Sequence, residues 1–135
     1  MTTNITPLRK GKMRILVVDD GITMRMYYRD VLEGAGFEVE EAVNGLEGVE
    51  RAMTDAFDLL VVDINMPKMD GYEVIRTVRE DVKLWRLPVL TISTEDKAMD
   101  ADKAYEVGAN FYMTKPVRPE DLTEIAHLLT GTTAR

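Results

Sequence analysis

Short runs typical of strands recur along the chain and are separated by longer segments of helical periodicity. The runs are RILVV at 14–18, EVEEA at 38–42, LLVV at 59–62, VLTIS at 89–93 and a weaker FYMT at 111–114. Runs of this length, rich in β-branched residues, are typical of strands. Because helical segments alternate with the strands, parallel pairing through right-handed crossovers is predicted.

Each segment after a strand repeats apolar residues three or four positions apart, which predicts an amphipathic helix. The residues expected on the buried faces are Met24, Tyr28, Val31, Leu32 and Ala35, then Leu46, Val49, Ala52 and Met53, then Val74, Ile75 and Val78, then Ala101, Ala104, Tyr105 and Gly108, and finally Leu122, Ile125, Ala126 and Leu129. The predicted fold class is therefore α/β, with a five-stranded parallel sheet doubly wound by five helices.

Three of the strands are mostly apolar, which predicts that both of their faces are buried at the centre of the sheet. These are 14–18, 59–62 and 89–93, whereas the charged run at 38–42 suits an edge. In open parallel sheets, ligands bind beyond the carboxyl ends of the strands, at the point where the strand order reverses. For the order 2-1-3-4-5, this point lies between the first and third strands.

Carboxylates end both of those strands. Asp19 and Asp20 follow the first strand and Asp63 follows the third, so all three are expected in one crevice. Two like charges about 4 Å apart, at an effective dielectric near 20, repel by roughly 4 kcal/mol. Such a cluster takes up protons or holds a cation, and its hard oxygen ligands favour Mg²⁺. The alternative, in which Asp20 caps a helix and Asp63 begins a turn, explains each residue singly but not the convergence of three.

Two more polar residues end strands at the same edge. Ser93 closes the fourth strand, and Lys115 follows the fifth, directly before Pro116. A carboxylate nucleophile, a metal, an ammonium and a hydroxyl are the groups that phosphoryl transfer needs, because the cations offset charge on the transferred oxygens. Aspartyl phosphate is a known covalent intermediate in such chemistry.

Composition and charge exclude several other classes of protein. The 135 residues suit one domain, and the 17 basic against 24 acidic residues give a net charge of −7, so no nucleic-acid partner is expected. The absence of cysteine excludes thiolate zinc sites, thiol catalysis and disulfides. No apolar run reaches the roughly 18 residues of a membrane helix and no signal peptide is evident, so we expect a cytoplasmic protein without membrane contact.

Four fragments, VVDDGITMR, VVDINMPKMDG, PVLTISTE and GANFYMTKP, make the chain resemble the receiver domains of bacterial two-component response regulators, above all the single-domain chemotaxis regulators. The resemblance covers residues 13–130 and leaves 1–12 as a flexible leader and 131–135 as a short tail. It implies the flavodoxin-like fold with strand order 2-1-3-4-5. That order is this family's own, so it is not independent evidence.

The resemblance implies a role for each residue of the acidic corner. Asp63 is the phosphoacceptor. Asp20, Asp63 and the main-chain carbonyl of Asn65 bind Mg²⁺, with Asp19 assisting.

Further roles are implied for the other strand ends. Lys115 contacts the phosphoryl group, Ser93 is the switch hydroxyl and Tyr112 is the aromatic switch. Ser93 is preferred to its neighbouring threonines because the following Glu95 keeps the motif in register, although the chemotaxis proteins usually carry Thr there. The family also implies a cis peptide bond between Lys115 and Pro116.

The expected function is that of a monomeric signalling module rather than an enzyme with an external substrate, although it promotes its own phosphorylation and dephosphorylation. A histidine kinase or histidine phosphotransfer protein donates the phosphoryl group. Because little sequence follows the fifth helix, output passes to a protein target on the face of helix four, strand five and helix five. The alternatives are a phosphate sink or a phosphorelay carrier.

Two other classes fit the residues less well. In a phosphohydrolase with aspartyl chemistry, the second residue after the nucleophile is an acidic general acid, but here it is Asn65. A flavodoxin-like nucleotide binder needs a Gly-rich or hydroxyl-rich loop after the first strand, where this chain has two carboxylates.

Overall fold

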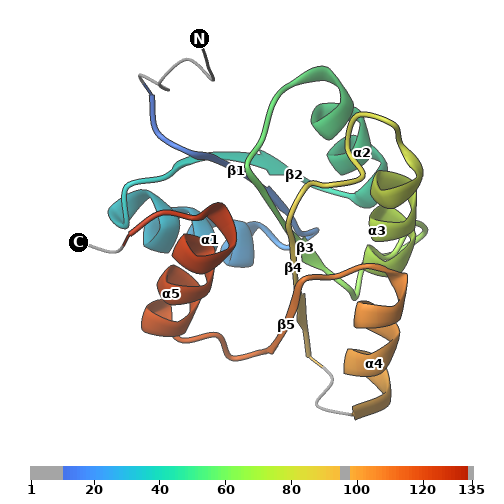
Figure 1. Cartoon of the computed structure of the whole chain (residues 1–135). Helices are drawn as coiled ribbons and strands as arrows, with labels where there is room; N and C mark the ends of the chain where they lie inside the picture. The colour runs from blue at the N-terminus through green and yellow to red at the C-terminus, as the bar shows by residue number, and fades with distance from the viewer. Residues whose placement is uncertain (1–10, 95–97, 134–135) are drawn as a thin grey trace, which may run out of the picture.

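The chain folds into five successive β-α units (Figure 1). The structure is a computed structural model that describes residues 11–94 and 98–133. The strands are β1 (Arg14–Val18), β2 (Glu38–Ala42), β3 (Leu59–Asp63), β4 (Val89–Ser93) and β5 (Phe111–Thr114). The helices are α1 (Ile22–Gly34), α2 (Gly45–Thr54), α3 (Gly71–Glu80), α4 (Ala98–Val107) and α5 (Pro119–Thr130). All five predicted strands are confirmed, and β3 extends to include Asp63 itself.

The sheet has the order β2-β1-β3-β4-β5, and every neighbouring pair is parallel. The predicted fold class is therefore confirmed. β1, β3 and β4 lie at the centre, and apart from Arg14 every residue in them is buried. The charged β2 lies at an edge, as its alternating pattern predicts.

Helices cover both faces of the sheet and form a separate apolar core on each (Figure 1). On one face, Tyr28 and Leu32 of α1 pack with Leu122 of α5. On the other, α2, α3 and α4 pack against the sheet, with Val74 of α3 fully buried. In α4, Ala104 is buried while Tyr105 is 46% exposed, so the expected burial of Tyr105 is wrong.

The buried face of α2 also differs from the prediction, because Leu46 and Met53 are largely exposed. The buried residues of this helix are Gly45, Gly48, Val49 and Ala52. A Cβ on Gly48 would lie 2.7 Å from Val18 Cγ2, so glycine lets the α2 backbone lie directly against β1. Since the helix packs through its small residues, its two larger side chains face outward.

The bond between Lys115 and Pro116 is cis, as the resemblance implies. Among the helices that the structure describes, none is both long enough and apolar enough to cross a membrane. Residues 1–10 of the expected leader, Glu95 and residues 134–135 of the expected tail lie outside the described residues.

Candidate functional site

The carboxyl ends of β1 and β3 place two aspartates side by side. Val18 pairs with Val62 in the sheet, so Asp19 and Asp63 follow at the same level. Both carboxylates are buried, with 2% and 4% of the residue exposed, whereas Asp20 is exposed. One oxygen from each of the three lies within 4.8 Å of the others.

Lys115 places its ammonium group beside this cluster. It follows β5, and its main-chain N–H donates to the carbonyl of Ser93 at 2.8 Å. Its ammonium Nζ lies 3.7 Å from Asp63 Oδ2 and 3.9 Å from Asp19 Oδ2. These contacts are longer than hydrogen bonds, so the ammonium lies close to both carboxylates without binding tightly to either.

Burial and mutual repulsion disfavour the charged forms of these acids. Burial is the largest cause and raises the pKa of Asp63 to about 6, and the charge of Asp19 acts in the same direction. The N–H of Asn65, which donates to Asp63 Oδ1 at 3.0 Å, and the Lys115 ammonium lower this pKa without cancelling the rise. Burial likewise raises the pKa of Asp19. An additional cation would therefore be bound favourably here.

The backbone around Asp63 is fixed by a close approach of α3. A Cβ on Gly71 would lie 2.7 Å from the carbonyl oxygen of Asp63 and 2.7 Å from the Cα of Ile64. Glycine is thus required for the start of α3 to lie against the end of β3. Asp70 caps this helix by accepting from the N–H of Glu73 at 3.0 Å, and the Glu73 carboxylate accepts from the N–H of Asp70.

The side chain of Asn65 joins the loop after β3 to the end of β4. Its Oδ1 accepts from Ser93 Oγ at 3.3 Å and from both the main-chain N–H and the hydroxyl of Thr94, each at 3.2 Å. Ser93 is therefore placed beside the acidic cluster, but Thr94 adjoins the same amide. Thr91 points elsewhere and donates to the carbonyl of Phe111.

Tyr112 lies on β5, in register with Thr91 of β4. Its half-buried ring packs against the core beneath α3 and α4. Tyr112 therefore belongs to the face formed by α4, β5 and α5, on the strand that pairs with the one carrying Ser93. Its role as a switch stays a prediction.

One charged residue near the site was not predicted from the sequence. Arg25 of α1 is 9% exposed, donates from Nη1 to the main-chain carbonyl of Asp19 at 2.8 Å, and pairs through Nε with Glu41 at 2.9 Å. It shares a helical stripe with Tyr28 and Leu32, which are both buried. A charged residue on an apolar stripe is the signal that would have found it.

The carboxylate oxygens of Asp19, Asp20 and Asp63 fit a hard divalent cation. Asp19 Oδ2 is buried and has no hydrogen-bond partner among the described residues, although a carboxylate oxygen in such a place normally has one. Asp20 and Asp63 offer further oxygens within reach of the same point. Cysteine and histidine do not contribute to this cluster, so its donor set is that of Mg²⁺ rather than of zinc.

Residues 15–127 match the sequence model of the response regulator receiver domain family. The chain is 36% identical over 122 residues to chemotaxis protein CheY1 of Helicobacter pylori, covering 89% of this chain and 98% of that protein. It is 38% identical over 113 residues to chemotaxis protein CheY-3 of Vibrio cholerae, covering 83% and 87%.

Solved structures show the same likeness. The chemotaxis protein CheY4 of Vibrio cholerae superposes with a TM-score of 0.84 at 33% identity, over 88% of this chain and 99% of that one. A CheY-like receiver domain protein from Methanospirillum hungatei superposes with a TM-score of 0.81 at 29% identity, over 90% and 96%.

Proposed function

Because the chain belongs to the response regulator receiver domain family, we propose that it is a signalling module switched by phosphorylation of Asp63. The observation that carries this proposal is a single carboxylate, that of Asp63. It is buried at the end of a central strand, within 4.8 Å of the oxygens of two other aspartates and 3.7 Å from the Lys115 ammonium. Such an arrangement suits a nucleophile better than a structural ion pair.

The oxygen of Asp63 would attack phosphorus, forming the acyl phosphate as the bond to the leaving group breaks. A histidine of a partner kinase or phosphotransfer protein is the proposed leaving group. Asp19, Asp20, Asp63 and the main-chain carbonyl of Asn65 would hold Mg²⁺. When bound, the ion would offset the negative charge of the cluster and of the transferred oxygens. The Lys115 ammonium, already beside Asp63, would bind one of those oxygens.

The hydroxyl of Ser93 would read the new group. The phosphoryl group adds acceptor oxygens where Ser93 now contacts the Asn65 amide at 3.3 Å. If Ser93 moved toward those oxygens, the end of β4 would shift and open space for the Tyr112 ring. Tyr112 pairs with Thr91, which lies two residues before the end of β4. The readout would then reach the face of α4, β5 and α5, where a downstream protein binds.

We propose that the protein acts in the cytoplasm as a monomer and that it passes on the signal by binding another protein. The phosphohydrolase alternative is disfavoured by Asn65, whose amide is no general acid and already bonds to Ser93 and Thr94. A phosphate sink or relay carrier shares all the chemistry and differs only in the fate of the phosphoryl group. A switch changes conformation beyond the pocket when it is phosphorylated, whereas a sink or carrier does not need to.

Labelling with acetyl phosphate and Mg²⁺ tests the phosphoacceptor. We expect one acid-stable, base-labile adduct that mass spectrometry maps to Asp63. Asp63→Asn should abolish the adduct, because an amide is not a nucleophile here. Asp55→Asn, at the other end of the sheet, should leave labelling unchanged. Full labelling of Asp63→Asn would overturn the assignment.

Backbone NMR shifts with and without beryllofluoride test the switch. In the wild type, shifts should extend from the pocket to α4 and β5, whereas in Ser93→Ala they should stay near Asp63. Thr94→Ala is the matched control and should behave as the wild type. Shifts confined to the pocket in the wild type would favour a phosphate sink.

A further inference from the structure

The loop between α3 and β4, residues 81–88, lies at the end of the sheet opposite the end of β3 that carries Asp63 (Figure 1). It exposes apolar side chains. Val82 is 87% exposed, and Trp85, the only tryptophan of the chain, is 56% exposed. Met53, near the end of α2, lines a pocket of about 230 Å³ together with Val82 and Lys83. Exposed tryptophan and methionine are enriched in the cores of protein interfaces.

Hydrogen bonds fix the backbone of this loop, although the side chains of Val82, Lys83, Trp85 and Arg86 are exposed. Asp81 Oδ1 accepts from the N–H of Lys83 at 2.7 Å, and the carbonyl of Asp81 accepts from the N–H of Trp85 at 3.0 Å. Arg79 donates to the carbonyls of Trp85 and Leu87 at 3.0 and 2.6 Å. A surface ordered in advance loses little conformational entropy when it binds.

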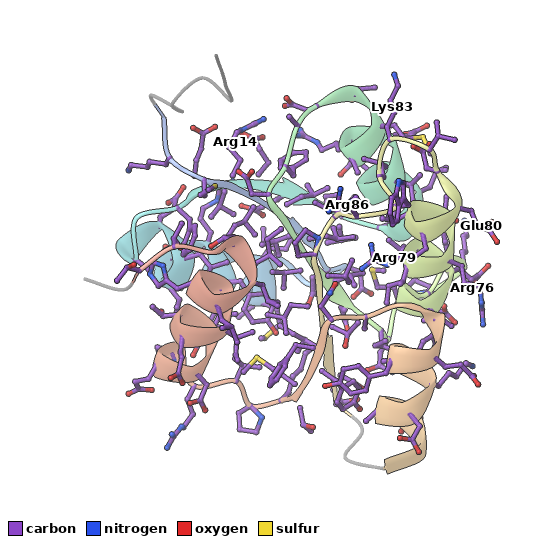
Figure 2. All side chains as sticks on the ribbon, in the orientation of Figure 1. Arg14, Arg76, Arg79, Glu80, Lys83 and Arg86 are labelled. Atoms are coloured by element: carbon purple, nitrogen blue, oxygen red, sulfur yellow. The ribbon has the colours of Figure 1, made fainter. Side chains whose placement is uncertain are left out.

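Basic residues outnumber acidic ones in the segment around the exposed tryptophan. Residues 76–88 contain four basic side chains, Arg76, Arg79, Lys83 and Arg86, and two acidic ones, in a chain whose net charge is −7. The Arg86 guanidinium lies 5.5 Å from the centroid of the Trp85 ring, and Lys83 extends away from the molecule (Figure 2). Within residues 11–94 and 98–133, neither Lys83 nor Arg86 forms an ion pair, whereas the carboxylate of Asp55 in the adjoining pocket is held by Arg14 at 2.8 Å.

We infer that Met53, Val82, Lys83, Trp85 and Arg86, here called the α3–β4 patch, dock an acidic segment of a partner protein that also carries a large apolar side chain. The two cations of the patch select the acidic groups, and Trp85 with Val82 buries the apolar side chain. A negatively charged membrane fits less well, because the chain as a whole would be repelled from it.

Docking at the α3–β4 patch is independent of phosphorylation. The patch adjoins the first residues of β3 and β4, whereas Asp63 and Ser93 are the last. A five-residue strand separates the two regions by about 13 Å or more. The docking itself does not rest on the proposed function; only its independence of phosphorylation does. The patch would hold the protein at a partner while the opposite end switches.

A random library of 15-residue peptides, selected on the immobilised full chain, tests the inference. We expect peptides enriched in Asp and Glu with one or two large apolar residues. Binding should shift Trp85 fluorescence to shorter wavelength and should weaken as salt rises. Trp85→Ala, Val82→Glu and the double change Lys83→Glu, Arg86→Glu should each weaken binding at least tenfold by calorimetry. Circular dichroism should show that these exposed changes leave the fold intact.

Matched controls separate this surface from the rest of the molecule. Leu128→Ala and Arg118→Glu change exposed side chains of α5 and its cap and should leave affinity unchanged. Asp63→Asn and the beryllofluoride-treated wild type should bind equally well. Selected peptides without acidic enrichment, or binding unaffected by the patch changes, would overturn the inference. Trp85-dependent self-association in sedimentation, or Trp85-dependent binding to phosphatidylglycerol vesicles, would also overturn it.

Discussion

Among the described residues, three carboxylates at the carboxyl end of the sheet surround a point faced by Lys115, whereas at the amino end Arg14 is surrounded by three carboxylates. Arg14 pairs with Glu38 and Asp55 at 2.8 Å each and with Glu40 at 3.9 Å, and its guanidinium lies over the ring of Phe57. A direct hydrogen bond from Arg14 holds the pKa of Asp55 below its usual range. The pKa of Asp63 is raised instead.

The contrast separates charge that supports the fold from charge that is kept for chemistry. At the amino end, Arg14 lies among its carboxylate partners. Arg79 donates hydrogen bonds to three main-chain carbonyl oxygens and one side-chain amide oxygen. At the carboxyl end, the net charge is negative and the cation contacts are long. The second arrangement costs stability but leaves the carboxylates able to bind a cation and a phosphoryl group.

Removing the metal or one of its ligands should have the largest effect. EDTA or Asp20→Ala should slow labelling by acetyl phosphate about 1000-fold, because the charge that stabilises the transferred oxygens is lost. The fold should survive, since Asp20 is exposed. Asp55→Ala removes a carboxylate from the opposite end and should label at the wild-type rate. An unchanged rate in excess EDTA would remove the metal from the mechanism.

Breaking the hydrogen-bond network at the amino end should cost the most stability. Arg79→Met leaves the carbonyls of Trp85, Leu87 and Gly108 without their side-chain donor and should lower the free energy of unfolding by about 4 kcal/mol. Arg76→Met, one turn earlier on the outer side of α3, should change it by less than about 0.5 kcal/mol (Figure 2). Urea denaturation measures both. Equal losses would show that the network contributes nothing.

The two ends should respond to pH with opposite sign. The fold raises the pKa of Asp63 from 3.8 to about 6, so this carboxyl favours the fold most below pH 4 and loses that contribution as pH rises through about 6. In EDTA at pH 7.5, Asp63→Asn should therefore be more stable than the wild type by about 3 kcal/mol, and the gain should vanish below pH 4.

Asp55→Asn should do the reverse. Its pKa is lowered in the fold, so its carboxylate favours the fold at neutral pH and loses this contribution on acidification. The variant should be less stable than the wild type at pH 7.5 and equal to it in strong acid. Denaturation curves at several pH values would reveal the two signs, and a common sign would contradict the comparison.

A methyl group at the carboxyl end should have a smaller effect on stability than the loss of the Arg79 network. In Gly71→Ala, the new Cβ meets backbone atoms of Asp63 and Ile64 that cannot move freely, so we expect a loss of about 2 kcal/mol and slower labelling. Gly34→Ala has open space around its Cβ at the end of α1 and should lose nothing. Thermal denaturation compares the two, and equal melting temperatures would contradict the close approach.

The sequence was sufficient for the strands and for the residues that end them. Mostly apolar runs of four or five residues determine the three central strands, because only a sheet covered on both faces can bury them. Parallel strands must bring their carboxyl ends to one edge, so the residue order alone predicts that Asp19, Asp63, Ser93 and Lys115 lie together. Their roles in phosphoryl transfer stay predictions.

Only the tertiary structure decided how the backbones approach one another. Periodicity placed Leu46 and Met53 in the core, but the contact of Gly48 with Val18 brings α2 so close to β1 that these side chains face outward. The partners of Arg25 and Arg79 lie on other elements, at separations along the chain that follow no periodicity. Local pattern determines which face of a strand or helix is apolar. The distance between two packed elements depends on both of them at once, and so do the polar contacts that fill it.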